Sequence, residues 1–90
     1  MGNIEWREVE PEREEWKRQI DIMFCEICKI GSLIYYEGTP GWNYIFDGME
    51  DFLFADSEDD GKKELIEIIV NNCNDYIAHY TAIKESIDRQ

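Results

Sequence analysis

The chain has 90 residues, 43% of them hydrophobic and 13% aromatic, and it carries a formal net charge of −12 at pH 7. This apolar content is enough to offset the entropy lost on folding, so the charge does not indicate disorder, and the length favours a single domain. A field this negative repels nucleic acid and anionic membranes, which argues against direct binding to either and favours a basic protein as partner.

The negative charge is concentrated in the middle of the sequence. Residues 30–61 contain eight carboxylates and no Lys or Arg, a net charge of −8. Residues 1–29 carry eight acids and five bases (−3), and residues 62–90 carry five acids and four bases (−1). The middle third is therefore where we expect a cationic partner to bind.

Cysteine usage and hydropathy favour a cytoplasmic protein. The three cysteines, Cys25, Cys28 and Cys73, are an odd number within apolar patterns, which is a poor basis for a disulfide framework and favours a reducing compartment. We find no signal-peptide pattern, and no apolar run approaches the ~20 residues of a membrane-spanning helix.

The first part of the chain is predicted to form an arm and a long helix. Residues 1–11 alternate loosely between apolar and polar side chains, which predicts a short extended N-terminal arm ending at Pro11. From residue 12 to 36, apolar residues recur at helical spacing behind an acidic first turn, and Gly38 has the chemistry of a C-cap. The apolar stripe of this helix comprises Trp16, Ile20, Met23, Phe24, Ile27, Ile30 and Ile34.

Two further helices are predicted, at about 40–55 and 62–88. Thr39 and Pro40 have the N-cap and first-turn chemistry of a helix start. The third helix has an apolar stripe about 40 Å long at 1.5 Å per residue, which is longer than the second helix can cover. The predicted fold is therefore all-α, a compact three-helix bundle over residues 12–90, in which the first helix or a second copy of the chain covers the rest of the stripe.

The second helix is predicted to present an aromatic residue among carboxylates. Its buried stripe comprises Trp42, Ile45, Phe46, Met49, Phe52 and Leu53. The opposite side carries Tyr44 with Asp47 and Asp51 at i+3 and i+7, so we expect Tyr44 to stand in solvent.

Residues 56–67 resemble the calcium loop of an EF-hand, in which carboxylates converge on the ion and a glycine permits a sharp turn. The matching residues are Asp56, Glu58, Asp60, Gly61, Glu64 and Glu67. Glu58 replaces the usual Asp or Asn, and Lys63 stands where EF-hands place an aliphatic residue. An acidic loop that caps the third helix is the favoured interpretation, and a single EF-hand-like calcium-binding protein is an alternative.

Neither zinc binding nor catalysis is indicated. Cys25-x-x-Cys28 would need Cys73 and His79 to complete a zinc site, but these side chains point in different directions on the predicted helices. His79 is the only histidine, and no nucleophile motif is present. Carboxylate pairs such as Glu12/Glu15 and Asp47/Glu50 are similar to the E-x-x-E pairs of all-α, magnesium-dependent nucleotide pyrophosphohydrolases, but Asp47 and Glu50 are predicted to point outward. We expect no catalytic residue, metal or cofactor.

One short segment resembles a known family of inhibitors. Leu33-Ile34-Tyr35-Tyr36 is similar to the helix-borne D-L-I-Y-Y segment of the nuclease-colicin immunity proteins, with Ser32 in place of the aspartate and Glu37 in place of the following proline. The resemblance implies a small acidic helical protein that blocks a basic nuclease with a tyrosine pair and surrounding carboxylates.

We therefore expect a small acidic inhibitor, of immunity or anti-defence type, and not an enzyme. It would bind the basic, nucleic-acid-binding surface of a nuclease, toxin or defence protein, with carboxylates in place of backbone phosphates. The expected contact residues are Tyr35, Tyr36, Asn43, Tyr44, Asp47, Glu50, Asp51, Asp56, Glu58, Asp59 and Asp60. The alternative is a structural or adaptor protein that self-associates, as a possible homodimer, through the C-terminal helix.

Overall fold

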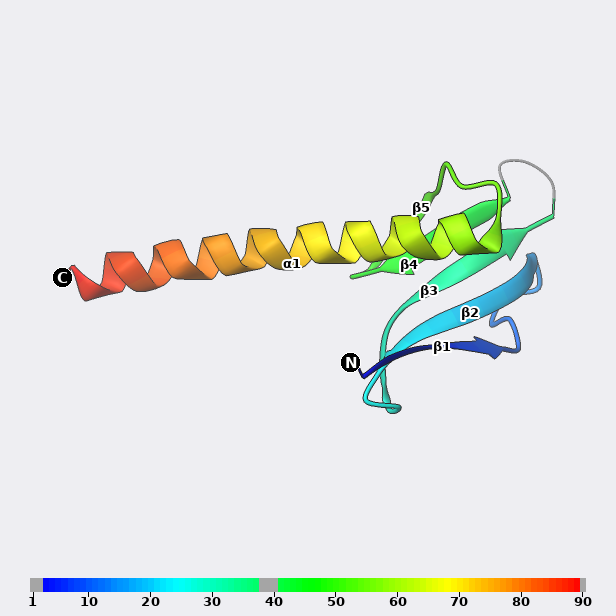
Figure 1. The fold of residues 1–90 in the computed structure, drawn as a ribbon, viewed down its shortest axis with the longest axis horizontal. Coiled ribbons are helices and arrows are strands. Elements are labelled where there is room, and N and C mark those ends of the chain that lie inside the picture. The colour runs from blue at the N-terminus through cyan, green and yellow to red at the C-terminus, as the bar shows by residue number, and fades with distance from the viewer. Residues whose placement is uncertain (1–2, 38–40, 90) are drawn as a thin grey trace.

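The structure is a computed structural model that describes residues 3–37 and 41–89. Five strands form one antiparallel sheet in which every strand pairs with its neighbours in sequence, in the order β1-β2-β3-β4-β5, and one long helix follows (Figure 1). The elements are β1 (Ile4–Val9), β2 (Trp16–Phe24), β3 (Cys28–Tyr36), β4 (Trp42–Phe46), β5 (Met49–Phe52) and α1 (Glu58–Asp88).

The predicted all-α three-helix bundle is therefore wrong. Most of the segment assigned to the first helix forms the hairpin β2–β3, and β4 and β5 occupy most of the segment assigned to the second. The residues expected to end the first helix and start the second, Gly38, Thr39 and Pro40, lie outside the described residues. The predicted arm contains strand β1, which pairs along β2. The C-terminal helix is present as α1 but begins at Glu58 instead of about residue 62.

The turn between β4 and β5 shows why this part of the chain is not helical. Phe46 pairs with Met49, so Asp47 and Gly48 alone make the turn, and both have positive φ angles, of 55° and 78°. A two-residue turn with both residues left-handed is the type I′ geometry that Asp-Gly favours and that matches the twist of the two strands. This turn aligns β5 along β4 as the outer strand of the sheet.

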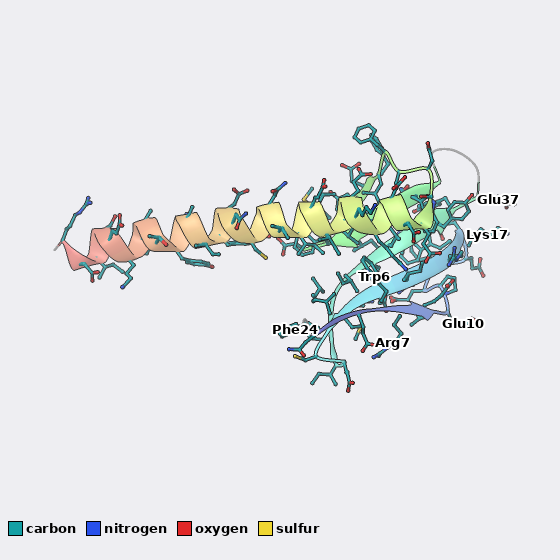
Figure 2. All side chains as sticks on the ribbon, viewed as in Figure 1. Trp6, Arg7, Glu10, Lys17, Phe24 and Glu37 are labelled. Atoms are coloured by element: carbon teal, nitrogen blue, oxygen red, sulfur yellow. The ribbon has the colours of Figure 1, made fainter. Side chains whose placement is uncertain are left out.

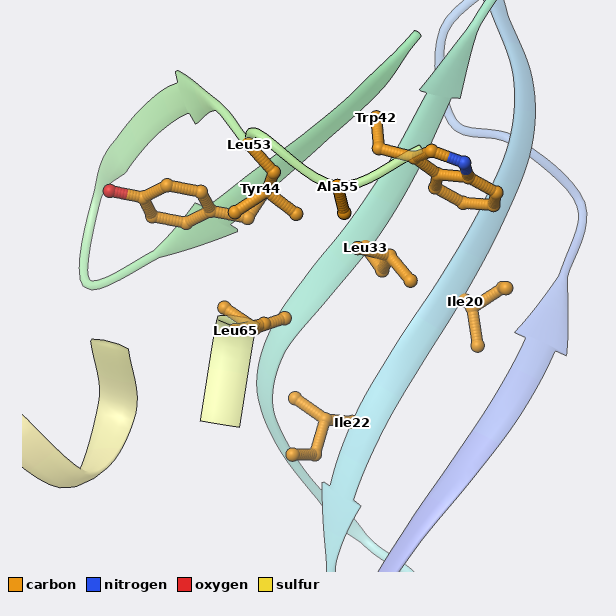
Figure 3. Close-up of a cluster of buried hydrophobic side chains, with 8 residues drawn as sticks. All are labelled: Ile20, Ile22, Leu33, Trp42, Tyr44, Leu53, Ala55 and Leu65. Carbon is orange, nitrogen blue, oxygen red and sulfur yellow. The ribbon is translucent and has the colours of Figure 1, made fainter. Parts of the chain in front are cut away.

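Helix α1 packs on one face of the sheet, against β3 and β4. Because side chains alternate between the faces of a strand, Ile20, Leu33 and Tyr44 point toward the helix from three neighbouring strands. The helix approaches β3 closely at Gly61, where a Cβ atom would lie 3.2 Å from Leu33 Cδ1. The core side chains are Ile20, Ile22, Leu33, Trp42, Tyr44, Leu53, Ala55 and Leu65 (Figure 3).

Ion pairs fasten the start of α1 to the sheet. Arg18 of β2 donates two hydrogen bonds of 2.8 Å to Glu8 of β1 and one of 2.8 Å to Glu58, which also pairs with Lys62. The hydrogen bonds from Arg18 lower the pKa of Glu8, those from Lys62 and Arg18 lower the pKa of Glu58, and both carboxylates raise the pKa of Arg18. The Trp6 side chain of β1 faces α1, and Lys62 of the helix lies over its ring (Figure 2).

The C-terminal half of α1 extends past the sheet and gives the molecule its elongated shape, 54 × 27 × 24 Å (Figure 1). From Cys73 onward, every described side chain of α1 is exposed. Among the described residues, no helix combines the length and the hydropathy needed to cross a membrane.

Candidate functional site

Strand β5 leaves one edge of the sheet open. Its four residues, Met49–Phe52, are all exposed, and it pairs only with β4 within the described part of the chain. An edge strand presents unpaired backbone groups as well as side chains, so it is a natural place for another molecule to bind. The side chains along this edge therefore define the candidate site.

Two phenylalanines stand exposed at this edge. Phe52 ends β5 and is 50% exposed, and Phe54 follows it in the connection to α1 and is 84% exposed. Their rings meet edge to face, with centroids 5.4 Å apart. Between them, Leu53 points the other way and is 1% exposed. This alternation anchors the segment through Leu53 and turns both aromatic rings toward solvent.

The backbone of Phe54 is held in place by the helix. Its N–H donates to both carboxylate oxygens of Glu64, at 3.0 and 3.1 Å. Ser57 caps the start of α1 by accepting a hydrogen bond from the N–H of Asp60 at 3.2 Å. The connection between β5 and α1 is therefore ordered by hydrogen bonds at both of its ends, so the exposed Phe54 ring is presented from a defined backbone.

Free carboxylates accompany the phenylalanines. Eight of the 21 acidic side chains form ion pairs with Lys or Arg among the described residues: Glu5, Glu8, Glu12, Glu15, Asp21, Glu37, Glu50 and Glu58. Between residues 47 and 60, the carboxylates that no described cation pairs are Asp47, Asp51, Asp56, Asp59 and Asp60. Two acidic residues of the same segment, Glu50 and Glu58, are already neutralised by Arg13, Arg18 and Lys62.

These free carboxylates come from the β4–β5 turn, from β5, from its connection to α1 and from the first turn of α1. Asp47, at the β4–β5 turn, accepts a hydrogen bond of 3.2 Å from the hydroxyl of Tyr76. Asp59 and Asp60 are in the first turn of α1. Because a helix rises 1.5 Å per residue, Asp60 and Tyr76 are about 24 Å apart along α1. We call the residues Asp47, Met49, Asp51, Phe52, Phe54 and Asp56 the β5 edge patch.

The tyrosines expected to make the contact are placed differently. Tyr44 was expected in solvent, and that expectation is wrong, because it faces α1 in the core and is 9% exposed. Tyr35 is half-buried against Trp42, with ring centroids 4.8 Å apart. The segment 33–36 is part of strand β3, which contradicts the helix implied by its resemblance to the immunity proteins.

Tyr36 belongs to a polar chain that links three strands on the face opposite the helix. Its hydroxyl accepts a hydrogen bond of 2.9 Å from the indole of Trp16 and donates to Glu50. The hydrogen bond to Glu50 raises the pKa of Tyr36. Arg13 pairs with the same Glu50 at 3.2 Å and lies over the ring of Trp16. Glu50 and Tyr36 therefore satisfy one another, and neither is free to bind a partner.

A second polar cluster on that face is also internally satisfied. Gln19 and Asp21, both buried, alternate with the core residues of β2 and so point away from α1. Asp21 accepts hydrogen bonds from Gln19 at 2.9 Å and Ser32 at 2.7 Å. Gln19 also donates to Glu12 at 2.8 Å, and that bond, with a second from Lys29, lowers the pKa of Glu12. The cluster ties the β1–β2 connection to the sheet.

Asn43 of β4, another expected contact residue, is half-buried on the face opposite the helix. Its Oδ1 is buried without a hydrogen-bond partner within the described residues.

The metal-like patterns do not form sites within the described residues. Residues 58–67 of the EF-hand-like segment are helical and do not curl into a loop. Cys25 lies in the β2–β3 turn and Cys28 begins β3, whereas Cys73 is on α1, and all three are free and exposed. No group of three or more His, Cys, Asp or Glu side chains in the described parts of the chain is arranged to hold a metal ion.

No protein-family model, curated protein or solved structure matches this chain. Its function is therefore inferred from its own surface.

Sequence reasoning located the acidic segment but missed the aromatic part of the site. Phe52 was assigned to a helical core, and Phe54 was assigned no role. The signal that could have found them is the Asp47-Gly48 turn, because it predicts a hairpin in which Phe52 belongs to an outer strand.

Proposed function

We propose that this protein is an acidic binding protein that occupies a basic surface of another protein through the β5 edge patch. The class of partner that best fits is a nuclease, toxin or defence component whose basic surface normally receives nucleic acid. Binding alone would then inhibit the partner, with no catalytic step.

The observation that carries the proposal is the exposed Phe52–Phe54 pair on an edge strand whose free carboxylate, Asp51, projects from the other face of the same edge and lacks a partner cation among the described residues. Exposed aromatic rings on an ordered backbone supply the contact area typical of binding hot spots. Free carboxylates attract a cationic surface over a distance and set its orientation. The two together favour a basic protein over a small molecule.

The layout of charge also supports a nucleic-acid-like surface. The free carboxylates extend from Asp47, which is hydrogen-bonded to Tyr76, to Asp60 in the first turn of α1, and Asp60 and Tyr76 are about 24 Å apart along that helix at 1.5 Å per residue. The phosphates of one DNA strand repeat about every 3.4 Å along the helix axis, so this length corresponds to several phosphates. A surface that binds backbone phosphates without reading bases could accept such a row.

The same charges disfavour another copy of this chain at β5. Two identical β5 edges would place like charges from Asp47 and Asp51 opposite one another, which is unfavourable. Acidic side chains on an edge strand are one way in which proteins prevent edge-to-edge pairing. The edge therefore selects for a partner of opposite charge.

The experiment is affinity capture of the tagged protein from a lysate of its natural host, with elution by rising salt and identification by mass spectrometry. The test variant, called the edge variant, reverses Asp47, Asp51 and Asp56 to lysine. The matched control reverses Glu10, Glu14 and Glu26, which are also exposed carboxylates without an ion pair among the described residues but come from the β1–β2 connection and the β2–β3 turn. Each reversal adds two charges, so both variants change the net charge from −12 to −6.

We expect a basic protein that elutes from the wild type and from the control, and that is lost from the edge variant. Phe54→Ala should weaken the same interaction, whereas Ile27→Ala, which removes an equally exposed side chain (89%) from the β2–β3 turn, should not. If both charge variants capture equally little of the basic protein, binding depends on net charge alone and not on the β5 edge patch. Retention by the edge variant would refute the proposal.

A further inference from the structure

The apolar stripe of α1 continues beyond the surface that it covers. Leu65 is fully buried, and Ile68 and Ile69 pack against the core. Farther along, the helix passes the end of the sheet (Figure 1), and its apolar side chains there are exposed, although the Tyr76 hydroxyl still reaches Asp47 of the β4–β5 turn. The exposed residues are Tyr76, Ile77, Tyr80, Ile83 and Ile87. A helical segment of this length is only marginally stable in water by itself, so we expect a second surface to cover the stripe.

The spacing of the stripe is that of a helix–helix interface. Seven residues follow one another at alternating intervals of three and four, as the a and d positions of a heptad do. We call these residues the α1 seam: Ile66, Ile69, Cys73, Tyr76, Tyr80, Ile83 and Ile87. Four carboxylates follow Leu65 in the sequence, and all of them fall at the b, c or f positions, away from the seam and its flanks: Glu67, Asp75, Glu85 and Asp88.

A groove beside the seam is also apolar. It has a volume of about 170 Å³ and lies between α1 and the first three strands. Its lining consists of aliphatic side chains: Ile4, Ile22, Ile30, Ile66, Ile69 and Val70. Strands lie about 4.8 Å apart and a helix is about 10 Å wide, so a five-stranded sheet whose helix covers β3 and β4 leaves room for a second helix over β1 and β2.

We propose that the α1 seam binds the α1 seam of a second copy of this chain, with the two helices antiparallel. In that arrangement the free end of each helix lies along the half of the other that carries the sheet, and it reaches the aliphatic groove. A parallel pair would instead bring the two sheets to the same end and leave the grooves without helix ends to fill them. The antiparallel layers are Ile69 with Ile87, Cys73 with Ile83, and Tyr76 with Tyr80.

The charges identify the occupant as a second copy. A chain of net charge −12 repels itself in general, so self-association requires a surface poor in acidic groups. The helix contributes no carboxylate to the seam, and Asp47, which reaches Tyr76 from the β4–β5 turn, accepts a hydrogen bond of 3.2 Å from its hydroxyl. A cationic partner would therefore find less negative charge here than along the β5 edge patch. A two-fold interface also needs one patch that complements itself, and the seam with its adjoining groove meets that need.

The test is the mass in solution, measured by size-exclusion chromatography with light scattering. We expect the full-length chain at micromolar concentration to have twice the 10.7 kDa of one chain. Ile83→Asp, on the seam, should return the mass to that of a monomer. Ala78→Asp introduces the same charge one and a half turns earlier, at an f position, and should leave the dimer intact. Residues 78 and 83 lie in the exposed half of α1, and circular dichroism checks that the sheet remains folded.

A monomeric wild type would overturn the proposal, and so would a dimer that survives Ile83→Asp. Orientation is tested by oxidising the Cys25→Ser/Cys28→Ser variant. A parallel pair places Cys73 beside its symmetry mate and would form a disulfide-linked dimer, whereas the antiparallel pair keeps the two thiols about 15 Å apart, ten residues at 1.5 Å per residue. Rapid cross-linking through Cys73 would therefore refute the antiparallel arrangement. The seam and the β5 edge patch meet at the hydrogen bond from Tyr76 to Asp47, but Ile83 lies about two helical turns beyond it, so a failure of the Ile83→Asp test leaves the proposed function untouched.

Discussion

Gly31 of β3 lies directly against the backbone of Ile45 in β4. A Cβ atom built on Gly31 would come within 2.6 Å of the Ile45 carbonyl oxygen, closer than such atoms approach in proteins. The obstructing atom belongs to the backbone, so it cannot rotate away. The contact makes glycine a requirement of the β3–β4 pairing at this point.

We therefore predict that Gly31→Ala destabilises the protein by about 1–3 kcal/mol, the usual range for atoms inserted into a packed interior. Urea unfolding followed by circular dichroism would measure the change. A neutral substitution would mean that β3 and β4 are not paired as described at Gly31.

Leu53 and Phe54 are adjacent residues with opposite roles, and their alanine variants should differ accordingly. Leu53 is buried in the core, so Leu53→Ala should lower the free energy of unfolding by about 2–5 kcal/mol. Phe54 is 84% exposed, so Phe54→Ala should change it by about 0.5 kcal/mol or less. Thermal unfolding of both variants makes the comparison. If Phe54→Ala is as damaging as Leu53→Ala, the ring packs inside the protein and is unavailable to a partner.

The helix α1 was foreseeable because its apolar residues recur at helical spacing over 31 residues, far longer than any strand. Strand β3 was not foreseen because its segment Leu33-Ile34-Tyr35-Tyr36 is apolar or aromatic on both faces, which erases the alternation that marks a strand. Strand β2 alternates over residues 19–22, but Met23 and Phe24 follow at once, and with Ile20 they also have helical spacing. A dense apolar run then fits a helical stripe equally well.

Whether residues 40–55 are given the period of a helix or that of a strand also determines which aromatic residues are expected to be exposed. In a helix over 40–55, Phe52 belongs to the buried stripe and Tyr44 to the opposite side. In the sheet, Tyr44 pairs with Leu33 and faces the core, while Phe52 lies on the outer strand. The location of the acidic charge did not depend on this choice, because it follows from the order of residues alone. The sequence could therefore predict where the charge lies but not which rings accompany it.

Acid should weaken the ties between the β1–β2 region and the rest of the fold. Hydrogen bonds from Arg18 to Glu8, from Lys62 and Arg18 to Glu58, and from Gln19 and Lys29 to Glu12 lower the pKa of these carboxyls below the ordinary value of 4.5. A lowered pKa in the folded state gives a stabilisation that is present above the unfolded value and lost as the pH falls through the folded one. We expect the contribution of these carboxyls to the free energy of unfolding to be constant above about pH 5 and to decline below pH 4.5.

Arg18→Gln tests the origin of this decline. The variant should be less stable at pH 7 by about 1 kcal/mol, since exposed ion pairs contribute about 0.2–1 kcal/mol each, and its stability should fall less steeply in acid. Lys17→Gln makes the same charge change at a residue whose ion pair within residues 3–37 and 41–89 is with Glu37 alone, so it should retain the slope of the wild type. Identical acid slopes for all three proteins would rule out Arg18 as the source.

Two tyrosines should lose their protons at unusually high pH. The hydrogen bond to Glu50 raises the pKa of Tyr36, and the negative charge of Asp47 raises that of Tyr76, both from an ordinary value of 10. The stabilisation that comes from the Tyr36–Glu50 contact is therefore present below pH 10 and lost as the pH rises through the raised pKa.

Absorbance of tyrosinate during alkaline titration measures the pH at which each tyrosine loses its proton, and the variants Tyr36→Phe and Tyr76→Phe assign the two steps. Glu50→Gln should lower only the pKa of Tyr36 and Asp47→Asn only that of Tyr76. If Glu50→Gln leaves the pKa of Tyr36 unchanged, the two side chains are not bonded in solution, and Glu50 pairs with Arg13 alone.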